Sequence, residues 1–197
     1  MRHLAVFARW PSEGRVKTRL SPALPPALAA RLHRAMLEDA LELARAAPVD
    51  RRWIYWADAP EADATLEPAA SRRARRSGAD LGERLERAFA DLLASPGDRA
   101  VAIGVDCPAL DASRIAAAFE RLERHDVVLG PARDGGYYLI GPRASPWRRF
   151  ATWRGNLRGA EALGRSGRRR RHDGGEARPR SMTSTFPPTW CAGSRMR

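Results

Sequence analysis

The sequence is poor in cysteine, in lysine and in long apolar segments. Two cysteines in 197 residues exclude a disulfide-stapled secreted scaffold, and no C-x-x-C pair or Cys/His cluster suggests structural zinc. No apolar run approaches the roughly 20 residues that a membrane span needs. The first fifteen residues lack the pattern of a signal peptide. We therefore expect a cytoplasmic globular protein with no membrane partner.

Basic residues are abundant, but they are unevenly distributed. The formal net charge is +12, and Lys17 is the one lysine among 35 basic residues. Residues 148–197 hold 13 arginines and 3 acidic residues, whereas residues 1–147 hold 22 basic and 20 acidic residues. The excess charge therefore belongs to the last quarter of the chain and says little about the folded part.

Apolar segments of strand length alternate with amphipathic segments of helix length up to about residue 147. We expect strands at residues 3–8, 52–57, 100–105, 126–130 and 137–141. We expect helices at 25–47 and 81–94, a third capped by Asp111 or Ser113, and a short edge strand within 61–80. This alternation predicts an α/β fold with a mainly parallel sheet. Ligands of such sheets bind where the strands end, so the loops there are candidate sites.

The pattern changes after residue 147. Residues 148–197 contain four consecutive arginines, a Gly-Gly pair and almost no aliphatic periodicity. Such a segment cannot bury enough apolar surface to offset the entropy lost on ordering. We therefore predict a folded domain at 1–147 and a largely disordered, Arg-rich tail at 148–197.

The loop after the first strand, residues 11–22, combines a turn with three cations. Gly14 permits a tight turn, and Arg15, Lys17 and Arg19 follow it. Lysine binds phosphate as a point charge and arginine binds it through two donors, which favours a phosphate-bearing substrate. The spacing differs from a Walker A loop. A solvated basic loop without a ligand is the alternative.

The segment at residues 104–110 places Asp106 directly after the most apolar predicted strand. A carboxylate there faces the ligand crevice, where it could hold a divalent cation that bridges a nucleotide diphosphate. The alternative role for Asp106 is a helix N-cap, but Asp111 is better placed for that role.

Two further segments carry weaker signals. Residues 130–141 contain Asp134, Gly135 and Gly136, where a glycine pair permits close approach of a ligand but also suits a hairpin turn. Residues 77–88 contain Gly82 and Arg84 at a helix start, which could face an anion or could simply open a surface helix.

In order, the blocks FARWPSEGRVKTRLSP, DLGERLERAF, GVDCPAL and GPARDGGYYLIG resemble the signature blocks of one family. The family is the glycosyltransferase-A-like nucleotide-diphospho-sugar transferases, and within it the arsenosugar-biosynthesis glycosyltransferase group. The resemblance covers residues 3–147. It implies a Rossmann-like three-layer α/β/α sandwich and a transferase that uses Mg²⁺ or Mn²⁺, a nucleotide-activated donor and a small acceptor.

The resemblance also implies roles for individual residues. Arg15, Lys17 and Arg19, beside Gly14, would contact phosphates, and Asp106 would bind the metal. Asp134, Gly135 and Gly136 would contact the acceptor or sugar, with Asp106 and Asp134 as the catalytic pair. Gly82 and Arg84 would shape the nucleotide pocket.

The chain departs from the family pattern after residue 147, where the fold is truncated. The family continues with an Asp-Val-Asp-x-Pro-x-Asp-Leu block whose acids assist the metal. Residues 181–192, back-translated with G or C in free third positions and shifted by one base, read Leu-Asp-Asp-Val-Asp-Val-Pro-Ala-Asp-Leu-Val-Arg. Our hypothesis is that the reading frame slips near residues 143–160, so that the tail is out of frame.

Several functions stay open beside glycosyl transfer. The first block is also similar to phospholactate guanylyltransferases, which makes nucleotidyl transfer the main alternative. An anion-binding or nucleic-acid-binding protein without catalysis is a third reading. No RNA-binding signature accompanies the arginines, so nucleic acid is not an expected partner. A chain left inactive by the altered C-terminus is a fourth. The oligomeric state does not follow from the sequence.

Overall fold

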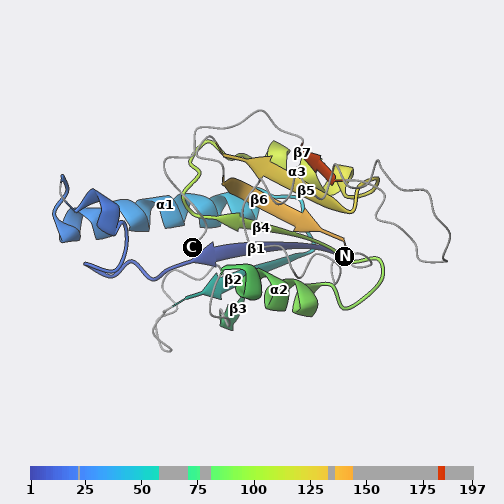
Figure 1. Ribbon diagram of the computed structural model, residues 1–197, viewed down its shortest axis with the longest axis horizontal. Helices are drawn as coiled ribbons and strands as arrows, with labels where there is room; N and C mark the ends of the chain where they lie inside the picture. Colours follow the sequence, from blue (N-terminus) through green and yellow to red (C-terminus); the bar gives the residue numbers. More distant parts are fainter. Residues whose placement is uncertain (22, 58–70, 76–80, 133–135, 144–181, 185–197) are drawn as a thin grey trace, which may run out of the picture.

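One seven-stranded sheet organises the chain, in the strand order β3-β2-β1-β4-β6-β5-β7 (Figure 1). The computed structural model describes residues 1–21, 23–57, 71–75, 81–132, 136–143 and 182–184. The strands are β1 (Arg2–Ala8), β2 (Arg51–Trp56), β3 (Ser71–Arg75), β4 (Arg99–Gly104), β5 (Val127–Pro131), β6 (Tyr137–Pro142) and β7 (Met182–Ser184). The helices are η1 (Thr18–Leu20), α1 (Pro26–Ala46), α2 (Leu81–Leu92) and α3 (Ala112–Arg121).

Strand directions confirm the predicted α/β fold and add one antiparallel strand. β3, β2, β1 and β4 are parallel neighbours, and β7 is parallel to β5. β6 runs antiparallel between β4 and β5. The apolar segments on either side of the Gly135-Gly136 pair therefore form a hairpin, which is one of the two readings of that motif.

Helices cover both faces of the sheet. Alternate residues of β1 point to opposite faces, with Leu4 and Val6 on one face and Ala5 and Phe7 on the other. The first face packs against α1 and α3, and the second packs against α2. The result is the three-layer α/β/α arrangement that the resemblance implies (Figure 1).

The helix ends follow signals that are visible in the sequence. Proline at the start of α1 suits its first turn, where the missing N–H costs nothing. Asp111 caps α3, and its side chain accepts a hydrogen bond from the Arg114 amide at 2.9 Å. The Arg52 guanidinium donates to carbonyls at the end of α1, including that of Ala47 at 2.8 Å.

Within residues 148–197 the structure describes one short strand, and the largely disordered character of this tail stays a prediction. In β7, Met182, Thr183 and Ser184 pair with Val127, Val128 and Leu129 of β5. A three-residue outer strand needs only backbone hydrogen bonds to its neighbour, so aliphatic periodicity does not reveal it. The rest of residues 148–197 lies outside the described residues. Across the described ranges, no helix has the length and apolarity that a membrane crossing requires.

Candidate functional site

The candidate site lies at the carboxyl end of the sheet, where β1, β2 and β4 finish. Because β1 and β4 are parallel neighbours, the loops that follow Ala8 and Gly104 emerge side by side. Lys17 comes from the first loop and Asp106 from the second. The Lys17 Nζ atom lies 2.7 Å from the Asp106 Oδ1 atom, although the residues are 89 positions apart in sequence. The structure thus joins the two strongest charged candidates of the sequence analysis.

Both side chains of this ion pair keep some access to solvent. The side chain of Lys17 is 15% exposed and that of Asp106 is 28% exposed. Removal from bulk water strengthens the attraction between the two charges. A ligand can still reach both groups, which a fully buried structural ion pair would not permit.

The basic loop has a defined backbone. Gly14 adopts φ 69° at the turn, a conformation that glycine takes without steric cost. Val16 is only 3% exposed and anchors the loop in the protein between Arg15 and Lys17. Lys17 is the one non-glycine residue with positive φ in the described part of the chain, at φ 51° and ψ 31°. Such a conformation costs on the order of 1–3 kcal/mol and is typical of functional sites.

Residues that the sequence analysis did not single out support the loop. The carbonyl of Arg9 accepts a hydrogen bond from His33 Nε2 of α1 at 3.1 Å, with the tautomer assigned by this contact. The Arg9 guanidinium donates to the Arg15 carbonyl at 3.3 Å. Trp10 packs on Trp56 with ring centroids 5.4 Å apart. The sequence hints at the support of the basic loop only through His33, a polar residue within the apolar pattern of the expected helix. The structure shows that this residue is buried.

The N-cap role that competed for Asp106 belongs to Asp111. Besides the Arg114 amide, the Asp111 carboxylate accepts a hydrogen bond from the Ser113 hydroxyl at 2.6 Å. These hydrogen bonds, first that from Ser113, hold the pKa of Asp111 below its usual value. Asp106 therefore does not serve as the cap of α3.

The remaining candidates lie in several places. Arg15 and Arg19 are exposed on the basic loop and η1. Gly82 and Arg84 occupy the first turn of α2, on the face of the sheet opposite α1. Asp134 and Gly135 lie outside the described residues, whereas Gly136 accepts a hydrogen bond from the Ala132 amide at 2.9 Å.

The donor set around Asp106 suits a divalent cation that also binds phosphate oxygens. Within the described ranges, no three His, Cys, Asp or Glu residues converge into a metal cage. Mg²⁺ in nucleotide sites is commonly held by one or two carboxylates together with phosphate oxygens and water. A single accessible carboxylate beside a lysine fits that pattern.

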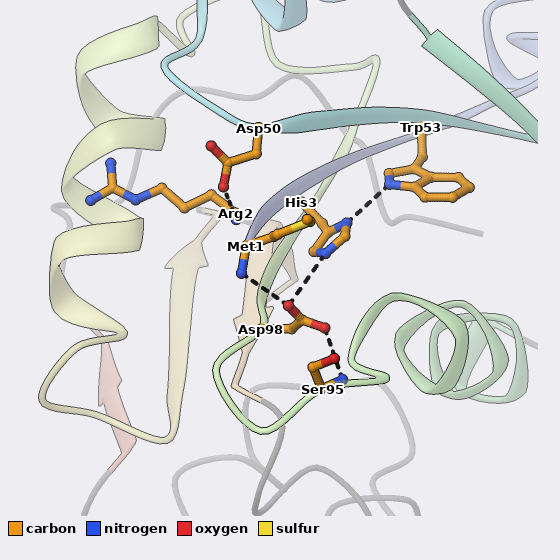
Figure 2. A network of polar contacts seen from close by, with 7 residues as sticks. All are labelled: Met1, Arg2, His3, Asp50, Trp53, Ser95 and Asp98. Carbon is orange, nitrogen blue, oxygen red and sulfur yellow. Dashed lines mark hydrogen bonds and ion pairs between the residues drawn. The ribbon is translucent and has the colours of Figure 1, made fainter.

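A second polar network ties the opposite end of the sheet together (Figure 2). The N-terminal ammonium donates to Asp98 Oδ1 at 2.9 Å, and the Ser95 amide donates to Asp98 Oδ2 at 2.8 Å. Trp53 Nε1 donates to His3 Nδ1 at 3.2 Å. This network connects the starts of β1, β2 and β4, far along the strands from the Lys17–Asp106 pair.

Burial and hydrogen bonding shift two groups of this network. Burial lowers the pKa of His3, and the nearby Asp98 carboxylate offsets only part of the effect. Burial works to raise the pKa of Asp98, but hydrogen bonds from the N-terminal ammonium and the Ser95 amide outweigh it and lower that pKa. Both shifts favour the state in which His3 is neutral and Asp98 is charged.

Comparison with known proteins identifies the family. Residues 27–154 match the family described as uncharacterized protein conserved in bacteria, DUF2064, and the chain belongs to that family. No curated protein matches the chain. The family and the fold together confirm the resemblance that the sequence blocks indicate.

Solved structures share the fold over most of the chain. A protein of Desulfovibrio desulfuricans G20, provisionally named a nucleotide-diphospho-sugar transferase, is 29% identical with TM-score 0.74, over 84% of this chain and 76% of that chain. A nucleotidyl transferase from Methanothermobacter is 19% identical with TM-score 0.61, over 85% of this chain and 83% of that chain. A Mycobacterium tuberculosis H37Rv protein in complex with manganese is 15% identical with TM-score 0.57, over 98% and 92%. The latter two similarities establish the fold alone.

Proposed function

We propose that this member of the DUF2064 family is a transferase that uses a nucleotide-activated donor. The finer proposal is transfer of a sugar from a nucleotide-diphospho-sugar to a small acceptor. The observation that carries it is the 2.7 Å ion pair between Lys17 and Asp106 at the carboxyl end of the sheet. The 29% identical protein of Desulfovibrio desulfuricans, provisionally named a nucleotide-diphospho-sugar transferase, supports the same class.

In this proposal the two loops divide the work on the diphosphate. Lys17, with Arg15 and Arg19, binds the diphosphate oxygens through its positive charge. Asp106 holds Mg²⁺ or Mn²⁺, which supplies charge neutralisation at the diphosphate when it is bound. Catalysis is then mainly positional and electrostatic, because the loops fix the donor and stabilise the charge of the leaving group.

Glycosyl transfer exchanges one bond at the anomeric carbon of the sugar for another. An acceptor oxygen forms a bond to the anomeric carbon of the sugar, and the bond from that carbon to the diphosphate oxygen breaks. The nucleoside diphosphate leaves with the electron pair, and the acceptor proton passes to a base or to solvent. Asp134, Gly135 and Gly136 remain our proposed contacts for the acceptor or sugar, and Gly82 and Arg84 for the nucleotide.

Nucleotidyl transfer is the second candidate, favoured by the fold shared with a nucleotidyl transferase from Methanothermobacter. Here an acceptor phosphate oxygen bonds to the α-phosphorus of a nucleoside triphosphate, and pyrophosphate leaves with the electron pair of the broken P–O bond. Product analysis separates the two: nucleoside diphosphate release supports glycosyl transfer, and pyrophosphate release supports nucleotidyl transfer.

Nucleotide binding with and without metal tests the proposal. We expect a UDP-sugar or a nucleoside triphosphate to bind in the presence of Mg²⁺ or Mn²⁺, and Asp106→Asn to remove the metal-dependent part of the affinity. Glu42→Gln is the control, because Glu42 is an exposed carboxylate on α1. Failure of every nucleotide to bind with metal, or equal loss in both variants, would show that the site is assigned wrongly.

A further inference from the structure

A small hollow lies between α1 and the segment that joins β4 to α3. It encloses about 30 Å³, and residues of α1 line one side of it while the chain from Gly104 to Leu110 lines the other. We propose that this hollow binds a small alkylammonium ion, with the alkyl group inside and the ammonium on the Asp39 carboxylate. The site goes beyond the proposed function, because neither Lys17 nor Asp106 lines the hollow.

One flank of α1 forms the first wall of the hollow. Met36, Ala40 and Leu43 recur at helical spacing, so their side chains lie on one side of the helix. Asp39 belongs to the same flank and is exposed, which places its carboxylate at the mouth of the hollow. The side chains of this wall are therefore apolar except at the mouth, where the wall carries a negative charge.

The chain between β4 and α3 forms the opposite wall. Val105, Cys107 and Leu110 line the hollow and are each only 8% exposed, so this wall is anchored in the core. The Leu110 amide donates to the Cys107 carbonyl at 3.0 Å, which closes a turn in the wall. Asp106 lies between two lining residues but pairs with Lys17 instead. The charge at the hollow therefore comes from Asp39 and not from the metal-binding candidate.

The Asp39 carboxylate has no protein cation to neutralise it. In the described part of the chain neither a hydrogen bond nor an ion pair engages Asp39, whereas the neighbouring Glu38 pairs with Arg34 at 2.9 Å. An anionic ligand would be repelled by this carboxylate. A metal ion would find too few protein ligands, because the described residues contain no cluster of three His, Cys, Asp or Glu. An organic cation is the ligand class that suits a single accessible carboxylate beside apolar side chains.

The volume of the hollow limits the part of a ligand that can enter it. A water-sized group needs about 10–15 Å³, so the hollow holds roughly two or three such groups. The side chains of Leu43, Val105 and Leu110 give dispersion contacts to carbon and no hydrogen bonds to water, which favours an alkyl group. Isobutylammonium combines a branched alkyl group of this size with a cation one carbon away.

Backbone amide NMR of the full chain tests the proposal with three probes that share one alkyl group. Isobutylammonium is a cation, isobutanol is neutral, and isovalerate carries a carboxylate on the same isobutyl group. At constant ionic strength, we expect isobutylammonium to shift the amide signals of Ala40, Val105 and Leu110 to saturation. Isobutanol should bind about fivefold more weakly, as expected for the loss of one favourable ion pair at an exposed site, and isovalerate more weakly still.

Variants of α1 separate the role of charge from the role of space. Asp39→Asn should reduce the affinity for isobutylammonium to that for isobutanol. Glu42→Gln is the matched control and should leave both affinities unchanged, because Glu42 is an exposed carboxylate of the same helix outside the hollow. Leu43→Phe enlarges a partly buried lining side chain and should weaken the binding of both probes. Met36→Phe repeats this last test if Leu43→Phe does not fold.

Each outcome supports or overturns the proposal. Saturable shifts at the lining amides, with a preference for the cation that is lost in Asp39→Asn and kept in Glu42→Gln, support it. The proposal is overturned if no probe shifts these amides, since water is then the occupant of the hollow. Equal affinity for isobutylammonium and isobutanol also overturns it, as does a preference for the cation that survives in Asp39→Asn. None of these measurements involves nucleotide or metal, so the proposed function is tested separately.

Discussion

Gly130, near the end of β5, is a position where one added methyl group should measurably destabilise the fold. A Cβ atom at this position would lie 2.6 Å from Tyr138 Cζ, 2.7 Å from Tyr138 Cε2 and 3.0 Å from Leu139 Cβ. Tyr138 is only 3% exposed and belongs to the core beneath α1 and α3, so its ring has little room to move away. The Leu139 contact involves the residue paired with Gly130 across the hairpin.

We expect Gly130→Ala to lower the free energy of unfolding by about 1–3 kcal/mol, the usual cost of overpacking a core. For a chain of this length, each kcal/mol lowers Tm by roughly 2–4 °C. Chemical denaturation followed by tryptophan fluorescence measures the change. Tyr138→Leu should recover part of the loss in the double variant, because the shorter side chain leaves space for the methyl group.

Gly97→Ala provides the matched control for this prediction. A Cβ atom at Gly97 meets nothing within 4 Å, so alanine there should change stability by no more than about 0.5 kcal/mol. Equal stability of Gly130→Ala and Gly97→Ala would refute the packing argument. Failure of Tyr138→Leu to restore any stability would locate the strain elsewhere.

Four further predictions concern stability and the coding sequence. Because burial lowers the pKa of His3 from 6.5, the unfolded chain binds the proton first, so urea unfolding should show stability declining as the pH falls through 6.5, and His3→Gln should remove this part of the decline. The separate loss at more acid pH, caused by protonation of Asp98 whose pKa is lowered from 3.8, should remain. Asp111→Ala should cost about 1 kcal/mol in the same assay, whereas Asp111→Asn keeps the cap and most of the stability. Arg52→Lys should cost roughly 1–2 kcal/mol, because an ammonium cannot reach the carbonyls at the end of α1 that the guanidinium spans. Sequencing the coding DNA should reveal a frame change near residues 143–160; an uninterrupted frame with a different shifted translation would contradict that hypothesis.

Local signals in the sequence were sufficient for most individual elements. The apolar run of β4, the proline-bounded α1 and the Asp111 cap of α3 each depend on neighbouring residues alone. The position of β6 between β4 and β5 depends on pairing across the sheet, which no local pattern encodes. Propensity identifies a strand, but tertiary packing selects its neighbours.

The candidate site shows the same division. The rule that parallel strands end at one side of the sheet predicts that Lys17 and Asp106 lie near each other. It does not predict their 2.7 Å contact or the left-handed backbone of Lys17. The contact of His33 with the Arg9 carbonyl was also beyond sequence reasoning, because the partner is a backbone atom of a distant loop.

The three residues of β7 have a consequence for any shortened form of this protein. They occupy the outer hydrogen-bonding side of β5, which would otherwise present unpaired amides and carbonyls to solvent. Exposed strand borders of this kind recruit strands from other molecules and promote self-association. A version ended at residue 147 would lose that shield, and light scattering of the shortened form would report whether it aggregates.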